Sequence, residues 1–129
     1  MGPERVIILA VIASSLISMA CAVPGIATFS NPTPLPSACY GSQVPSTLFA
    51  AVNPDLYNNG TACGRRYRIR CTGPTNENVP QPCRNGEVVV TIVDLCIACQ
   101  PDQFDLSAEA FSRIADPNAA RIRIEYNEA

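Results

Sequence analysis

Residues Glu87 to Leu95 read EVVVTIVDL, and this run decides the fold class. It is rich in β-branched residues and almost continuously apolar, which is typical of a strand buried on both faces. The dipeptide Asn85-Gly86 just before it predicts a turn. We therefore expect a mainly β protein whose central strand is Glu87–Leu95.

Further strands are predicted on both sides of this run. Arg65 to Cys71 and Arg121 to Tyr126 alternate polar and apolar residues, which is typical of half-buried strands. Gly25 to Ser30 is also strand-like, whereas Thr47 to Val52 (TLFAAV) fits a buried strand or a helical turn equally well. The side chains expected to point inward are Tyr67, Ile69, Cys71, Ile122, Ile124 and Tyr126.

One helix is predicted from Ser107 to Ala115. Ser107 is a favourable N-cap, and Phe111 and Ile114 belong to an apolar stripe at helical spacing. Asp116-Pro117-Asn118 should end the helix. The stretch from Thr72 to Arg84 is rich in Pro, Asn and Gly and predicts a long loop.

The first 22 residues are typical of a signal peptide. Met1 to Arg5 is a short charged start, and Val6 to Ala20 is almost wholly apolar but short for a membrane span. Ala20-Cys21-Ala22 has the form of a cleavage site, so we expect cleavage after Ala22. An uncleaved anchor is the alternative, although no charged stop-transfer flank follows. The prediction is a secreted chain with one domain at residues 23–129 and no further membrane insertion.

Cleavage would leave an even number of cysteines. Cys21 leaves with the signal, and the remaining six imply three disulfides with roughly 15 pairings open. Cys96-Ile97-Ala98-Cys99 has the Cys-x-x-Cys spacing that also occurs in zinc sites and in redox motifs. Zinc would need a second ligand pair, and a thioredoxin-like motif would open a helix, whereas this one precedes a Pro-containing loop. We expect no metal and no cofactor. The six cysteines are Cys39, Cys63, Cys71, Cys83, Cys96 and Cys99.

The composition narrows the classes of partner. The net charge is −2, and the chain contains no Lys, no His and no Trp. A nucleic-acid partner would require a basic excess. Without His the chain lacks the commonest general base and metal ligand, and without Trp it lacks the best stacking surface. We expect a monomer that does not bind nucleic acid.

Several motifs taken together resemble the N-terminal domain of expansins. The same core occurs in family 45 endoglucanases and in barwin-like proteins. The single-domain length, CTGPTN at 71–76 and VPQPC at 79–83 are most similar to plant natriuretic peptide-like and blight-associated proteins. The shared motifs are GIATF at 25–29, ACYG at 38–41, NGTACGRRY at 59–67, VDLC at 93–96 and FDLS at 104–107, followed by AEAFSRIADP.

This resemblance implies a six-stranded double-psi β-barrel with one short helix. It implies disulfides Cys39–Cys63, Cys71–Cys83 and Cys96–Cys99. It also implies a place in the plant apoplast or cell wall. Members of this group are linked to water and solute homeostasis and to stress or defence responses, as extracellular signals rather than hydrolases.

Asp105 is the first candidate for chemistry. The matching stretch of the endoglucanases is His-Phe-Asp-Leu, whose Asp is the general acid, and here Gln103 replaces the His. Glycoside hydrolysis normally needs two carboxylates. The endoglucanases carry the second just before the first conserved Cys, but TFSNPTPLPSAC at 28–39 contains no acid. Ordinary cellulase activity should therefore be absent. The alternative role of Asp105 is to cap the helix at Ser107.

Asp94, at the end of the central strand, is the second candidate. Related barrels that cleave peptidoglycan non-hydrolytically use an Asp in a similar position, where one acid–base residue suffices. We expect Asp94 and Asp105 to line one groove, flanked by Tyr40 and Tyr67. The alternatives are a carboxylate held by loop amides for Asp94, and core positions for the tyrosines.

The densest charge is the arginine cluster at residues 65–70. Period-two spacing places Arg66, Arg68 and Arg70 on one face, where they could clamp the carboxylate of an acidic pectic sugar or of a partner. The alternative is a solvated strand face. Separately, Asn59-Gly60-Thr61 is an N-glycosylation sequon in a predicted turn.

Three functional hypotheses follow. The first is a secreted, non-enzymatic signalling or stress and defence protein, whose receptor would meet the surface loop between Cys39 and Cys63. The second is a module that binds or loosens wall polysaccharide, as expansins do. The third is a glycan-cleaving enzyme that uses Asp94 and Asp105.

Overall fold

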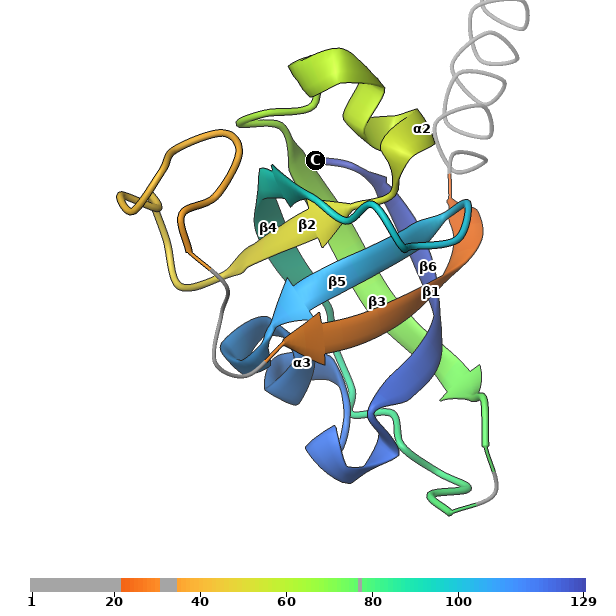
Figure 1. The fold of residues 1–129 in the computed structure, drawn as a ribbon. Coiled ribbons are helices and arrows are strands. Elements are labelled where there is room, and N and C mark those ends of the chain that lie inside the picture. Colours follow the sequence, from red (N-terminus) through yellow and green to blue (C-terminus); the bar gives the residue numbers. More distant parts are fainter. Residues whose placement is uncertain (1–21, 31–34, 77) are drawn as a thin grey trace, which may run out of the picture.

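The computed structural model describes residues 22–30, 35–76 and 78–129 (Figure 1). The predicted signal peptide lies outside these residues, apart from Ala22. None of the helices in the described ranges is long and apolar enough to cross a membrane.

Six strands close into a barrel, as the resemblance implies. Around the barrel their order is β1-β5-β2-β4-β3-β6, and β6 pairs again with β1 (Figure 1). The strands are β1 (Val23–Ser30), β2 (Phe49–Val52), β3 (Arg66–Pro74), β4 (Val88–Leu95), β5 (Gln103–Ser107) and β6 (Arg121–Glu128).

Pairing between distant segments decides the conformation of two short segments that the sequence pattern did not assign as strands. The TLFAAV run contains the short strand β2, which pairs in parallel with β4 and antiparallel with β5. The pattern of single residues did not predict β5, because its five residues follow a loop and run straight into a helix. β5 is a strand because β1 and β2 supply hydrogen-bond partners on both sides.

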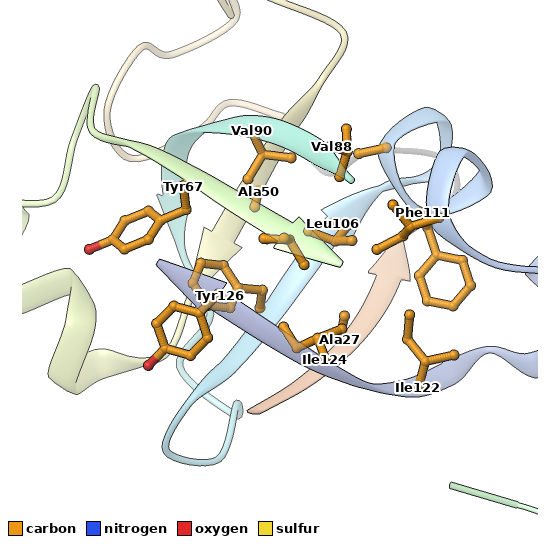
Figure 2. Close-up of a cluster of buried hydrophobic side chains, with 14 of the residues drawn as sticks. Ala27, Ala50, Tyr67, Val88, Val90, Leu106, Phe111, Ile122, Ile124 and Tyr126 are labelled. Atoms are coloured by element: carbon orange, nitrogen blue, oxygen red, sulfur yellow. The ribbon is translucent and has the colours of Figure 1, made fainter. Parts of the chain in front are cut away.

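The interior of the barrel is filled by the side chains that the alternation predicts. Ile69, Ile122 and Ile124 are fully buried or nearly so, and β4 contributes Val90 and Ile92. Figure 2 shows Tyr67 and Tyr126 together at one end of this core and Phe111 at the other. The rings of Tyr67, Tyr126 and Phe104 pack edge to face, with centroids 4.7 to 6.0 Å apart.

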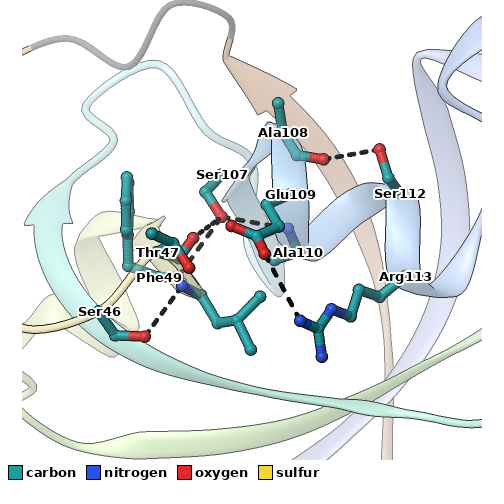
Figure 3. Close-up of polar contacts among 10 residues, drawn as sticks. Ser46, Thr47, Phe49, Ser107, Ala108, Glu109, Ala110, Ser112 and Arg113 are labelled. Carbon is teal, nitrogen blue, oxygen red and sulfur yellow. Dashed lines mark hydrogen bonds and ion pairs between the residues drawn. The ribbon is translucent and has the colours of Figure 1, made fainter.

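Ser107 starts the predicted helix, α3 (Ala108–Ile114), and also ties it to β2 (Figure 3). Its hydroxyl oxygen accepts from the Ala110 amide at 3.2 Å, as an N-cap should. The same hydroxyl donates to the Thr47 carbonyl at 2.7 Å. One buried side chain therefore sets both the start of α3 and the path of the chain into β2.

The remaining helices are short. α2 (Pro54–Tyr57) is capped by Asn53 and was not predicted. A 3-10 turn, η1 (Asn58–Gly60), follows where the Asn-Asn-Gly signal predicts a turn. A second 3-10 turn, η2 (Pro117–Ala119), lies after α3, where Asp116-Pro117 was expected to end the helix.

The three disulfides have the pairing that the resemblance implies. Their Cα atoms are 5.3 to 5.5 Å apart, within the usual range for a disulfide. Cys39–Cys63 and Cys71–Cys83 fasten loops, and Cys96–Cys99 closes the short turn after β4.

Gly25 is required where β1 meets the loop before β5. A Cβ atom at this position would lie 2.3 Å from the Asp102 carbonyl oxygen, which accepts a hydrogen bond from the Ile26 amide. We predict that Gly25→Ala lowers the free energy of unfolding by about 2 kcal/mol, because backbone must move to relieve the clash. Denaturant unfolding of the oxidised protein measures this loss.

Gly73→Ala is the matched control, since a Cβ there meets nothing within 4 Å. Its free energy of unfolding should stay within about 0.5 kcal/mol of the wild type or rise slightly. Equal losses in the two variants would contradict the role given to Gly25.

Tyr126 links stability to alkaline pH. Burial and then the hydrogen bond from its hydroxyl to Asp102 raise the pKa of the Tyr126 phenol well above its ordinary value. Because the folded state holds this proton more tightly, the stabilisation is complete below about pH 10 and is lost as the pH rises towards the folded pKa. We predict that unfolding free energy falls above about pH 10, and falls less steeply in Tyr126→Phe. Parallel slopes in both proteins would contradict this linkage.

Candidate functional site

A small groove opens where β2, β4 and β5 meet the end of β1. Its volume is about 90 Å³. It is lined by both candidate carboxylates together with mostly apolar side chains. The lining residues are Ser30, Leu35, Ser37, Phe49, Ala51, Val93, Asp94, Leu95, Cys96, Asp105 and Leu106.

β2 brings Asp94 and Asp105 to this groove. Ala51 is the register partner of Asp94 on β4 and of Asp105 on β5. Neighbouring strands lie about 4.8 Å apart, so the two Asp Cα atoms are roughly 10 Å apart across β2. Ala51 has only a methyl side chain, which leaves the space between them open. The prediction that the two residues line one groove is confirmed.

The Asp105 carboxylate is fixed by hydroxyl groups of β1. Ser30 donates to one oxygen at 2.6 Å, and Thr28 donates to the other at 3.1 Å. Gln103 is buried and donates to the Thr28 hydroxyl at 3.2 Å, so Gln103 supports the carboxylate through Thr28. The helix-capping role suggested for Asp105 is wrong, because Ser107 caps α3 with its own hydroxyl.

The Asp94 carboxylate is held by a loop. Its Oδ1 accepts from the Ala38 amide at 2.9 Å, which is the loop-amide contact considered for it. The carbonyl of the preceding residue, Val93, accepts from the Cys39 amide at 3.0 Å. These contacts join the loop that begins at Leu35 to the end of β4. No sequence pattern identifies Ala38, Thr28 or Ser30 as partners, because each lies more than 50 residues from its Asp.

This groove can bind hydroxyl groups. Carboxylates accept hydrogen bonds, and Leu35 and Leu95 supply apolar surface beside them. Its volume is well below the roughly 300 to 1,000 Å³ of pockets that enclose a small molecule. The groove is therefore suited to a contact with part of a longer chain.

The tyrosines do not flank the groove as expected. Tyr67 is 6% exposed and packs in the barrel core, so it is not accessible to a ligand (Figure 2). Tyr40 is 38% exposed in the loop after Cys39, but it does not line the groove. The core interpretation holds for Tyr67.

The arginine cluster lies on the outer face of β3, as predicted, but much of its charge is neutralised. Arg68 pairs with Glu87 at 3.0 Å, and Arg70 pairs with Glu125 on β6. Arg65 lies 4.0 Å from Glu128. Within the described ranges, Arg66 is the member of the cluster without an ion pair. The face is thus largely a set of exposed ion pairs with neighbouring segments, each worth about 0 to 1 kcal/mol.

The described residues contain no group of three or more side chains placed to hold a metal ion. The Cys96–Cys99 pair is a disulfide, and Cys96 lines the groove through its position after β4.

Comparison with known proteins identifies the family of the fold. The family model described as lytic transglycolase, a double-psi β-barrel domain, matches residues 49–126. An EG45-like domain containing protein of Citrus jambhiri is 46% identical over 126 residues, covering 97% of this chain and 96% of that protein. A putative EG45-like domain containing protein of Arabidopsis thaliana is 42% identical, covering 86% and 87%.

A solved structure extends the similarity to expansins. A mutant expansin of Clavibacter michiganensis, in complex with cellohexaose, superposes with a TM-score of 0.66 at 28% identity. The match covers 84% of this chain and 50% of that one, so this chain spans about half the length of the expansin.

The sequon lies on the surface. Asn59 and Thr61 are both exposed in and after η1. We predict that the protein made in a secretory host carries an N-glycan at Asn59, seen by mass spectrometry and removed by a glycan amidase. Thr61→Ala should abolish the added mass, because the hydroxyl residue of the sequon is lost. An unmodified wild-type mass would refute the prediction.

Proposed function

We propose that this chain binds a neutral wall glucan across the groove of Asp94 and Asp105 without cleaving it. The chain belongs to the family of EG45-like domain proteins, whose fold is a double-psi β-barrel. The observation that carries the proposal is the meeting of two hydrogen-bonded carboxylates beside apolar side chains in one open groove.

The chemistry of the groove suits sugar hydroxyl groups. A carboxylate that is already fixed by protein donors keeps lone pairs for a further donor, and it loses little freedom when the ligand arrives. Asp105 is fixed by Thr28 and Ser30, and Asp94 by the Ala38 amide. Leu35, with 49% of its surface exposed, offers an apolar contact for the face of a sugar ring.

The roles that hydrolysis requires support binding without cleavage. One carboxyl group must present a proton to the leaving oxygen while a second activates water or attacks the sugar as the nucleophile. Both oxygens of Asp105 accept protein hydrogen bonds in the structure, so the group is arranged as an acceptor. The segment at 28–39, where the endoglucanases carry their second acid, contains none.

The complex of an expansin with cellohexaose supports a glucan as the ligand class, although this chain spans only half of that protein. A shallow groove on one small domain predicts weak binding to any single oligosaccharide. A long polymer, which offers many equivalent sites, is the ligand that suits it.

The place of action is part of this proposal. Action on a wall polymer requires export, which fits the predicted signal peptide, and an apoplastic location is proposed with it. A signalling role in water and solute balance, stress or defence stays a prediction from the resemblance. Its receptor surface needs one correction, because the segment between Cys39 and Cys63 contains the barrel strand β2. Only the exposed parts of that segment on either side of β2 are available to a receptor.

The test measures binding and cleavage in the same samples. The purified, oxidised protein is incubated with insoluble cellulose and with cellohexaose, and both retention and release of reducing or unsaturated ends are scored. We expect retention without release. Asp105→Asn and Asp94→Asn should each weaken binding about tenfold, because a charged hydrogen-bond acceptor is lost.

Asp55→Asn is the matched control, because Asp55 is exposed on α2 and does not line the groove. It should bind like the wild type. Release of ends by the wild type that is lost in Asp105→Asn would establish an enzyme instead. Retention that is equal in all four proteins would remove the groove from the proposal.

A further inference from the structure

We propose a second ligand site on the barrel, an open groove between β1, β6 and β3 that binds carboxylated polysaccharide through Arg121 and Arg123. The groove has a volume of about 430 Å³. Apart from the two arginines, its lining includes Pro24 and Ile26 from β1, and Thr72 and Thr75 from β3 and the residues after it. This inference goes beyond the glucan proposal and does not rest on it.

The two arginines differ from most others in the chain. Arg65, Arg68, Arg70 and Arg113 each lie within 4.0 Å of a glutamate. Across the described ranges, Arg121 and Arg123 form no ion pair. Arg121 donates only to the neutral side chain of Gln100, at 3.3 Å. The sequence cluster expected to clamp a carboxylate is thus largely occupied, with Arg66 left unpaired in the described ranges, whereas two unpaired guanidinium groups lie together on β6.

The strand geometry points both groups to one face. Residues two apart in a strand project from the same side, so Arg121 and Arg123 stand roughly 7 Å apart along β6. Ile122 between them is fully buried, which fixes the arginines outward. Arg123 is paired in register with Ile26 on one side and Gly73 on the other, so it lies in the middle of the groove floor.

The lining fits an acidic sugar polymer. A guanidinium group binds a carboxylate with two parallel hydrogen bonds, and two such groups in a row meet successive acids of a repeating chain. The Thr72 hydroxyl can bond a sugar hydroxyl, and the Thr75 hydroxyl, which donates to the Arg121 carbonyl at 3.0 Å, can accept from one. Pro24 and Ile26 provide apolar contact. Glu125 also lines the groove, but its carboxylate is paired with Arg70.

This groove is separate from that of Asp94 and Asp105. The first is formed around β2, β4 and β5, and the second on β6 with its neighbours β1 and β3, at a different part of the closed barrel (Figure 1). The acidic groove would repel a polyanion. Because the whole chain has a net charge of −2, general attraction does not explain polyanion binding, which would have to come from a local basic site.

The experiment measures affinity for polygalacturonate at low salt, with a fully methyl-esterified polymer of the same backbone for comparison. We expect the wild type to bind the acid form and not the ester. Arg121→Gln combined with Arg123→Gln should raise the Kd about tenfold or more, since charge-assisted hydrogen bonds are lost. Arg66→Gln is the control and should bind like the wild type, because Arg66 is exposed, has no ion pair within the described ranges and does not line the groove.

Two results would overturn the proposal: equal affinity of the double variant and the wild type, or equal binding of the acid and ester polymers. Circular dichroism and thermal unfolding of each variant exclude loss of fold as the cause. The Asp105→Asn protein should bind polygalacturonate like the wild type, and the double variant should retain binding to neutral glucan. Failure of one site is therefore distinguished from failure of the other.

Discussion

The strand β2 is the constraint on which the rest of the structure depends. It has only four residues, yet it joins β4 to β5 and so closes the barrel. Its inward residues, Ala50 and Val52, are fully buried, while Ala51 faces the groove. Both ends are fixed by buried polar side chains. Before β2, the Ser107 hydroxyl donates a hydrogen bond to the Thr47 carbonyl. After β2, the backbone and side-chain nitrogens of Asn53 both donate to the Gln103 carbonyl, each at 3.2 Å.

Much of this fold could be predicted from local patterns, and the remainder depends on pairing. Alternation is a local property, so β3 and β6 and their inward side chains were predictable. The run EVVVTIVDL was predictable as a strand from its β-branched residues. Its central position was wrong, because a closed barrel has no central strand and the residues of β4 alternate between buried and half-buried from Val88 to Ile92. By contrast, β5 is short and has no pattern of its own, and β2 fits two conformations. Both become strands only because the chain returns to give them partners, which no short window of sequence contains.

The candidate site likewise has a part that was predictable from local motifs and a part that depends on pairing between distant segments. The type and position of Asp94 and Asp105 followed from motifs, whereas their donors come from β1 and from the loop at Ala38. The spacing of Arg66, Arg68 and Arg70 gave the correct face, but cross-strand register decided that glutamates of neighbouring segments would occupy two of them. For the same reason Arg121 and Arg123, which have the same spacing on β6, were not distinguished by the sequence.

The charge of the molecule is therefore better described by its faces than by its sum. A net charge of −2 combines an acidic groove on one part of the barrel with a pair of arginines on another. Each groove is open, so each should bind one segment of polymer weakly. Because the barrel is rigid, the protein loses little conformational freedom when both grooves bind at once. Where neutral and acidic polymers lie side by side, binding at one groove would hold the other groove close to its own polymer, at a high effective concentration. Retention in a matrix of both polymers should then exceed retention on either polymer alone.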